Sequence, residues 1–108
     1  MRHVIETGLD SVARTRLVDV LDAIGDPVRL RIMDMIVTAG EVPCSKLDSE
    51  LGIAKSTVSY HMKMLHTVGL VHTRREGRWY CYQPTELATE LIPALQALAQ
   101  HHLLGDII

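Results

Sequence analysis

Hydrogen-bonding side chains crowd one short stretch of the sequence, between Lys55 and Thr67. At about 100° per residue in a helix, Val58, Met62 and Leu65 fall on one side. The opposite side contains hydrogen-bond donors and positive charge but no acidic residue. Its members are Ser56, Tyr60, Lys63 and Thr67, with Ser59 at the edge. Solvated helix faces usually mix both signs of charge, so a face without carboxylates is typical of a surface that binds an anion.

The distribution of charge favours the same interpretation, although the net charge of the chain is −2. Residues 54–78 contain five basic residues against Glu76 alone, a local charge of +4. The remaining six basic and twelve acidic residues sum to −6. A basic segment on an otherwise acidic body is the electrostatic footprint expected of a nucleic-acid-binding surface.

Two helices with clear end signals precede this stretch. Residues 9–24 carry an apolar helical stripe that ends at Gly25. Asp26 and Pro27 then read as an N-cap and a first helical position, where a proline loses no hydrogen bond. The helix that they open is predicted to end at Gly40, because glycine suits the left-handed conformation found at helix C-termini.

A short helix, a hairpin and a final helix complete the predicted order. Pro43 begins the short helix, which turns at Gly52 into the polar stretch described above. "LVHTRR" and "RWYCYQ" are β-type runs on either side of the turn signal Glu76-Gly77. The final helix is rich in Leu and Ala, and Pro93 inside it is expected to kink or divide it.

This order predicts a mainly α chain with a small β-hairpin, a winged helix-turn-helix of the order α-α-α-α-β-β-α. We expect one domain over residues 1–108, with the helix-turn-helix at about 44–68 and the wing at about 70–83. In such a fold the second helix of the motif lies in the major groove, where Ser, Thr, Tyr and Lys donate to phosphates and base edges.

Dimerisation helices are expected at about 9–24 and 85–103. Their apolar stripes exceed what a chain of 108 residues can bury against its own core, which predicts a homodimer. The residues expected at the dimer interface are Leu9, Val12, Ala13, Leu17, Leu21, Leu87, Leu91, Leu95 and Leu98.

Composition excludes several other classes of protein. No apolar run approaches the roughly 20 residues of a membrane span, and no signal-peptide core is present. Two cysteines without such a signal indicate a cytoplasmic protein with free thiols. An enzyme is not expected, because the histidines are scattered and neither an acid pair nor a Gly-rich phosphate loop stands out. No cofactor is predicted.

The segments "LDAIGDPVRLRIMDMI" and "GEVPCSKLDSELGIAKSTVSYHMKMLHTVGLVHTRREGRWYCYQ" resemble the arsenic-responsive repressor (ArsR/SmtB-type) family of bacterial transcription regulators. The resemblance covers about residues 17–100. It implies a homodimeric repressor that binds double-stranded DNA at a pseudo-palindromic operator and is released by a signal, here an unknown effector.

Site residues follow from the same resemblance. Ser56, Thr57, Ser59 and Tyr60 occupy the exposed recognition-helix positions of the family. Phosphate contacts are implied for Lys55 and Lys63 and, in the wing, for Arg74, Arg75 and Arg78. His61 lies beside the apolar stripe, where structural packing is expected rather than base reading.

The family's metal sites are not retained in this sequence. Where relatives carry the thiolate motif Cys-x-Cys-Asp, the chain has the sequence Pro43-Cys44-Ser45-Lys46, and one thiolate does not hold a soft metal. The other family site, on the last helices, corresponds to Glu86, Ala88, Ala99 and His102. Glu86 and His102 are weak candidate ligands, so no metal is expected.

Two alternative functions stay open. Some relatives sense oxidants through a cysteine pair, and Cys44 and Cys81 would serve a redox-responsive repressor if their Cα atoms approached within about 4.4–6.8 Å. A winged helix can also act purely as a protein-docking module. The concentration of positive charge on the recognition helix and wing favours DNA over a protein partner.

Overall fold

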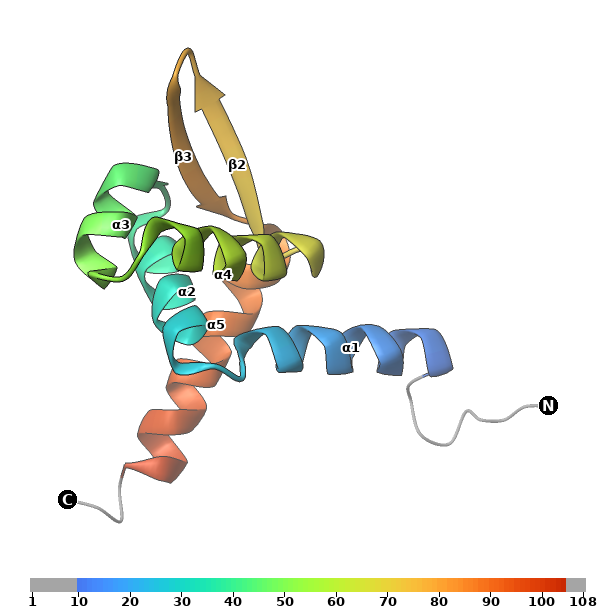
Figure 1. The fold of residues 1–108 in the computed structure, drawn as a ribbon. Helices are drawn as coiled ribbons and strands as arrows, with labels where there is room; N and C mark the ends of the chain where they lie inside the picture. Colours follow the sequence, from blue (N-terminus) through green and yellow to red (C-terminus); the bar gives the residue numbers. More distant parts are fainter. Residues whose placement is uncertain (1–9, 105–108) are drawn as a thin grey trace.

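The computed structural model describes residues 10–104, so Leu9 of the predicted dimer stripe lies outside the described residues. Figure 1 shows two helices, α1 (Ser11–Ile24) and α2 (Pro27–Ala39), followed by the short α3 (Cys44–Leu51) and then α4 (Lys55–Thr67). A hairpin of β2 (Val71–Glu76) and β3 (Trp79–Pro84) leads into α5 (Glu86–Leu98). This is the winged helix-turn-helix order predicted from the sequence.

The helix ends follow from local side-chain chemistry. The Asp26 carboxylate accepts hydrogen bonds from the backbone N–H groups of Val28 and Arg29, which caps α2. These bonds, led by the one from Arg29, lower the pKa of Asp26. At the other end of α2, Gly40 adopts a φ of 80°, as expected for a helix-terminating glycine.

The β-sheet has one strand more than predicted. The residues Val42–Pro43 form β1, which pairs antiparallel with β3 and gives a three-stranded sheet of order β1-β3-β2. Val42 lies opposite Tyr82, and Pro43 lies opposite Cys81. Two residues are too few to show the alternation that identifies a strand in a sequence. The predicted hairpin itself is present, with Gly77 at a φ of 59° in its turn.

The core gathers around α2. Its residues Ile32, Met33 and Ile36 are fully buried, and they belong to one apolar cluster with a fully buried residue from each of α3, α4 and α5: Leu47, Leu65 and Ile92. Because α2 contacts both α4 and the wing strand β3, it is the support that fixes the two elements relative to each other.

Pro93 was expected to kink or divide the last helix, and the division is wrong. The helix α5 continues through Pro93 without division and passes into a π-helical turn, η2 (Ala99–Leu103). The burial of Ala88 and Ile92 anchors the first turns of α5 to the body, which offsets the one intrahelical hydrogen bond that a proline removes.

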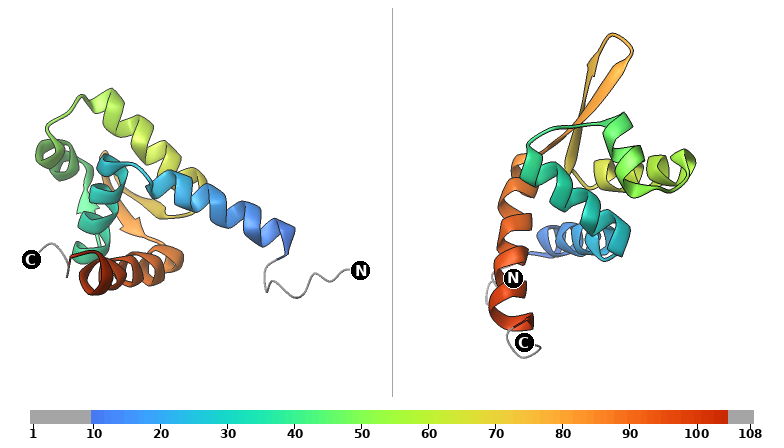
Figure 2. Two further views of the ribbon diagram at one scale, coloured as in Figure 1. Left: turned by 90° about the horizontal axis from the view of Figure 1, so that it is seen from below. Right: turned by 90° about the vertical axis from the view of Figure 1, so that its left-hand side faces the viewer.

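The wing, α1 and the end of α5 extend from the body in different directions. Figure 2 shows the wing projecting at one end of the molecule, while the C-terminal part of α5 projects at the other end and α1 extends to the side. Within residues 10–104 no helix is long and apolar enough to span a membrane.

Candidate nucleic-acid interface

The two faces of α4 divide as the periodicity predicts. Val58, Met62 and Leu65 are buried against the core. All six predicted contact residues of this helix are exposed, and the Tyr60 side chain, at 56% exposure, is available over more than half its surface. These residues are Lys55, Ser56, Thr57, Ser59, Tyr60 and Lys63. The exposed face therefore presents hydroxyl and ammonium donors without a carboxylate.

A polar contact under α4 fixes the helix in place. The His61 side chain is only 9% exposed, and Arg29 Nη1 of α2 lies 3.1 Å from His61 Nδ1. Because a guanidinium can only donate, His61 Nδ1 is the acceptor in this contact. Arg29 also donates from Nε to the Ala23 carbonyl at the end of α1. His61 is thus a packing residue, as expected, but through a hydrogen bond that the sequence did not reveal.

Arg74 lies in β2, and its guanidinium contacts two carboxylates of the chain. Its Nε and Nη2 atoms donate to both oxygens of Glu41, at 3.0 and 2.9 Å, and Nη1 forms a further ion pair with Glu76 at 3.1 Å. These interactions raise the pKa of Arg74, the Glu41 hydrogen bond most of all. In the structure two carboxylates match the charge of Arg74, which joins the wing to the segment after α2.

Glu41 is the centre of this contact, which we call the wing clamp (Glu41, Arg74 and Gln83). Gln83 Nε2 donates to Glu41 Oε1 at 2.8 Å, so both wing strands are joined to the same carboxylate. Hydrogen bonding by Arg74, opposed in part by burial, lowers the pKa of Glu41 from 4.5 to about 2. The clamp therefore stays ionised over the physiological pH range.

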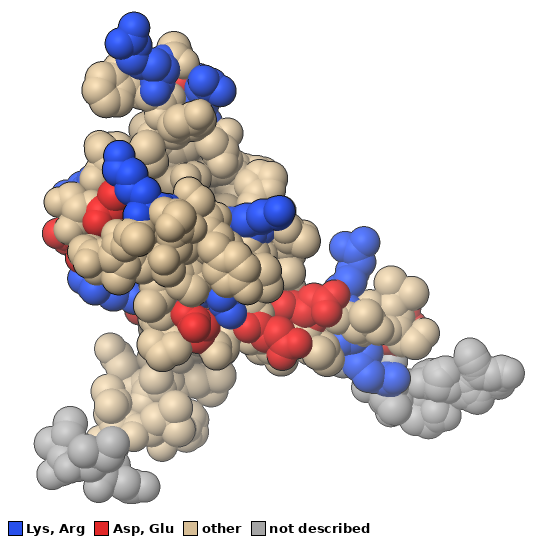
Figure 3. Space-filling view, in the orientation of Figure 1, with Lys and Arg blue, Asp and Glu red and all other residues tan. Residues whose placement is uncertain are grey.

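Two exposed basic residues, Arg75 and Arg78, lie at the wing tip. Arg75 donates to the Gly77 carbonyl at 3.2 Å, and its guanidinium lies 4.8 Å from the centre of the Tyr80 ring. Arg78 is exposed in the turn, next to the exposed Trp79. Figure 3 shows basic atoms at the wing tip and beside α4, whereas acidic atoms gather over the part of α1 nearest to α4.

The two cysteines belong to different elements, Cys81 to β3 and Cys44 to the start of α3. Cys81 shares a face of β3 with Gln83 because side chains alternate along a strand, and its Sγ lies 3.9 Å from Arg74 Nη2. Cys44 is the first residue of α3. Tyr82 lies on the other face of β3 from Cys81, and its pKa is raised, mainly by burial and next by the nearby Cys44. Burial also raises the pKa of Cys81. Both thiols are free in the structure, and the redox-responsive alternative stays a prediction.

The weak metal candidates are not brought together with other ligands. Glu86 is at the start of α5, and His102 lies in η2 beyond its end. Both side chains are exposed. No group of three or more His, Cys, Asp or Glu residues that could hold a metal occurs within residues 10–104.

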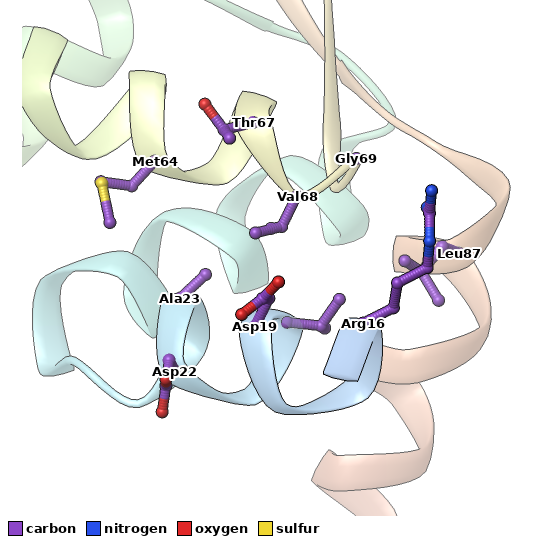
Figure 4. Close-up of a pocket in the computed structure, with 10 residues that line it drawn as sticks. Arg16, Asp19, Asp22, Ala23, Met64, Thr67, Val68, Gly69 and Leu87 are labelled. Carbon is purple, nitrogen blue, oxygen red and sulfur yellow. The ribbon is translucent and has the colours of Figure 1, made fainter. Parts of the chain in front are cut away.

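A cavity of about 710 Å³ lies between α1, the end of α4 and the start of α5. Figure 4 shows Met64 and Val68 on the α4 side of this cavity and Asp19 and Ala23 on the α1 side, with Leu87 of α5 at its margin. The C-terminal end of α4 is therefore packed less tightly against α1 than the middle of α4 is against α2.

The apolar stripes of α1 and α5 are largely uncovered in the single chain. Most of the predicted interface leucines and valines are exposed, whereas Ala13, Leu91 and Leu95 are partly buried. Val18, which was not among the predicted interface residues, is also exposed, and so are Leu103 and Leu104 beyond α5. The exposed members are Val12, Leu17, Val18, Leu21, Leu87, Leu98, Leu103 and Leu104.

Comparison with known proteins identifies the family. A family model described as a helix-turn-helix domain matches residues 24–74. A putative arsenical resistance operon repressor from Halobacterium salinarum is 35% identical over 95 residues, which is 87% of this chain and 80% of that protein. The regulator NmtR from Mycobacterium tuberculosis is 32% identical over 97 residues, covering 88% of this chain and 80% of NmtR.

Solved structures agree in fold. HlyU from Vibrio cholerae superposes with a TM-score of 0.75 at 27% identity, over 83% of this chain and 97% of HlyU. The homodimeric winged helix-turn-helix domain of Mb0332 from Mycobacterium bovis, a possible ArsR-family regulator, gives a TM-score of 0.79 at 26% identity, over 95% of this chain and 92% of that domain. The fold, the exposed α4 and these relatives agree. The chain therefore belongs to the ArsR family of winged helix-turn-helix DNA-binding transcriptional regulators.

Proposed function

We propose that this protein is a dimeric repressor that binds a pseudo-palindromic operator through α4 and the wing tip. The observation that carries the proposal is the exposed, carboxylate-free face of α4 beside a hairpin whose tip is basic. The relative from Halobacterium salinarum is itself named a putative operon repressor. A repressor that binds chromosomal DNA would work in the cytoplasm, and this function would need no catalytic step.

The proposed DNA contacts divide by chemistry. Ser56, Thr57, Ser59 and Tyr60 read base edges, because hydroxyl groups both donate and accept hydrogen bonds. Phosphate contacts come from the basic residues of α4 and the wing tip, Lys55, Lys63, Arg75 and Arg78. Arg74 is left out of this set because the wing clamp engages its guanidinium.

The dimer is proposed from the uncovered stripes of α1 and α5. Two-fold symmetry would place two copies of α4 on one side of the dimer, about one turn of DNA apart, which matches a pseudo-palindrome. Mb0332, which shares the fold, is described as homodimeric. The signal that releases the repressor is proposed to differ from the family's metals, because Pro43, Ser45, Ala88 and Ala99 replace their ligands.

Salt dependence of DNA binding tests the proposal. The duplex is the region upstream of the protein's own gene, and affinity is measured by fluorescence anisotropy between 50 and 200 mM salt. Each neutralised phosphate contributes about −0.9 to the log–log slope, so we expect affinity to fall about 10³-fold or more if 6–10 phosphates are contacted.

Arg78→Ala is expected to weaken binding to every duplex and to reduce the magnitude of the slope by about 1 per subunit. Arg16→Ala removes the same charge from α1, away from the wing, and should leave the slope unchanged. An affinity indifferent to salt, or equal effects of the two variants, would contradict the assignment of the wing to phosphate contact.

A further inference from the structure

A cavity separates the C-terminal end of α4 from α1. Its volume is about 710 Å³, and the start of α5 forms its margin. Cavities that hold small molecules in proteins commonly measure about 300–1,000 Å³, and they combine an apolar wall with a few polar groups that orient the ligand. This cavity is within that range, and its lining has both features.

The wall of the cavity is apolar on both sides. Its apolar side chains come from α1, from α4 and its end, and from α5: Val20, Ala23, Met64, Val68 and Leu87. Met64 and Leu87 are exposed in the single chain, so part of this wall is uncovered. Covering it with the apolar part of a ligand is favourable, because apolar surface leaves water.

Two opposite charges stand beside this wall. Asp19 and Arg16 both extend from α1 toward the side where α4 lies, whereas Asp22 points the other way (Figure 4). Asp19 and Arg16 are exposed, and neither forms an ion pair or a side-chain hydrogen bond with another residue of the described range 10–104. A ligand with one positive and one negative group therefore matches both charges without displacing an existing partner.

The spacing of the two charges suits one small molecule. Residues at i and i+3 of a helix have Cβ atoms about 5–6 Å apart, a distance that neighbouring ammonium and carboxylate groups can bridge. The remaining polar side chain of the lining, Thr67, already donates from its hydroxyl to the Lys63 carbonyl at 2.8 Å. Asp19 and Arg16 are thus the polar groups that orient a ligand here.

The face of α1 that lines the cavity is not the face that carries its exposed leucines. Arg16 and Asp19 share one side of the helix, and at about 100° per residue Leu17 and Leu21 fall on the opposite side. A partner subunit seated on those leucines therefore does not fill the cavity. Of the exposed stripe residues in the described range, Leu87 at the margin is the one that also lines it.

The place of the cavity couples a ligand to the position of α4. Arg29 donates to the Ala23 carbonyl at the end of α1 and contacts His61 of α4, so the two helices are joined near one end of the gap. Toward the C-terminal end of α4 the cavity separates them. A ligand that contacts both helices there changes the angle between them. In a dimer joined through α1 and α5, that angle sets the spacing of the two copies of α4, which must match one turn of DNA.

We propose that this cavity binds an L-α-amino acid with a large apolar side chain, and that binding weakens the affinity for the operator. Asp19 pairs with the α-ammonium group and Arg16 with the α-carboxylate, while the apolar side chain lies against Met64 and Val68. The proposal rests on the proposed DNA-binding function, for which it supplies the signal of release.

Calorimetry on the DNA-free protein tests the binding site. The probes are L-phenylalanine, L-leucine and L-methionine, and L-alanine is the control that keeps both charges without the large apolar group. We expect at least one probe to bind more tightly than L-alanine. The amine that lacks its carboxylate and the acid that lacks its ammonium group should each bind about tenfold more weakly. For phenylalanine these two compounds are 2-phenylethylamine and 3-phenylpropanoate.

Two variants of nearly unchanged size test the role of each charge. Asp19→Asn removes the partner of the ammonium group, and Arg16→Gln removes the partner of the carboxylate. We expect each variant to bind the amino acid about tenfold more weakly, while Asp19→Asn leaves the affinity for the acid without an ammonium group unchanged. Asp22→Asn, on the same helix but pointing away from the cavity, is the matched control and should bind normally (Figure 4). Circular dichroism verifies the fold of all three.

Anisotropy of the labelled upstream duplex measures the regulation. A saturating amino acid should lower the affinity for DNA about fivefold or more in the wild-type protein and in Asp22→Asn. At the same amino acid concentration, Asp19→Asn should respond less. Because such coupling is reciprocal, the DNA-bound protein should bind the amino acid more weakly by the same factor.

Each outcome decides the proposal. Binding that depends on both charges and lowers the affinity for DNA supports it. If no probe binds, or if Asp19→Asn and Asp22→Asn behave alike, the site is overturned; if a probe binds without changing the affinity for DNA, the regulation is overturned. Both results leave the proposed function standing. If the protein binds no duplex even without amino acid, the proposed function fails and the regulation fails with it, while calorimetry still decides the site.

Discussion

At the scale of single residues, we propose that different side chains on the exposed face of α4 perform two tasks. Ser56 and Tyr60 carry hydroxyl groups able to discriminate bases, whereas Lys55 and Lys63 supply charge that any phosphate accepts. The buried contact between Arg29 and His61 lies directly beneath this face and fixes its angle. The proposed base-reading side chains and the side chain that positions the helix therefore lie on opposite sides of α4.

Removing a base-reading hydroxyl should reduce specificity more than overall binding. Tyr60→Ala or Ser56→Ala is expected to weaken operator binding by about 1–3 kcal/mol and to leave binding to random-sequence duplex nearly unchanged. Ser11→Ala, at the start of α1, serves as the control for Ser56. Competition titrations with both duplexes measure the difference, and equal losses on both would show that this face only holds phosphate.

Residue roles were predictable from the sequence where they depend on local periodicity. The inward side chains of α4 repeat at helical spacing, so their burial could be inferred. The roles of Arg74 and His61 depend instead on partners far along the chain: Glu41 lies 33 residues from Arg74, and Arg29 lies 32 residues from His61. A count of charges in residues 54–78 therefore does not show which of them pair within the chain.

At the scale of elements, the wing clamp determines how the hairpin stands relative to α4. Glu41 follows α2 directly and receives hydrogen bonds from β2 through Arg74 and from β3 through Gln83. The strand β1, which the sequence did not reveal, begins at the next residue and pairs with β3. Side-chain and backbone contacts thus join the wing to the same point of the chain.

Acid should weaken the clamp. The pKa of Glu41 is lowered from 4.5 to about 2 in the folded protein, so its contribution to stability is complete above pH 4.5 and is lost as the pH falls toward 2. We expect the free energy of unfolding to fall more steeply over this interval for the wild-type protein than for Glu41→Gln, which keeps the size but does not titrate. Urea denaturation at several pH values tests this, and parallel pH profiles would show that the ion pair contributes nothing.

At the scale of the whole molecule, the single chain leaves its terminal helices incompletely packed. Leu17 and Leu98 are 42% and 53% exposed, whereas Leu91 and Leu95 already contribute to the core. The sequence showed the stripes but not this division, because periodicity alone does not distinguish a side chain packed on its own core from one left for a partner. The exposed positions are therefore the ones that test the dimer.

Charge placed in the stripe should separate the subunits without unfolding them. In the double variant Leu17→Glu, Leu98→Glu, carboxylates would be buried unpaired in a dimer but solvated in a monomer. We expect sedimentation to show a monomer with native circular dichroism and strongly reduced operator affinity. Leu30→Glu on α2 is the control, since Leu30 is exposed outside both stripes. A wild-type protein that sediments as a monomer at micromolar concentration, yet binds its operator tightly, would refute the dimer.

The pairing of β1 with β3 also has a consequence for the order of folding. Val42 and Tyr82 are 40 residues apart in the chain, so this contact closes a long loop, whereas the helices form from neighbouring residues. During synthesis, α3 and α4 emerge before the strand that completes the sheet. The match to the helix-turn-helix family model ends at residue 74, ahead of β3. The wing therefore takes its final position relative to α4 only after its second strand has docked.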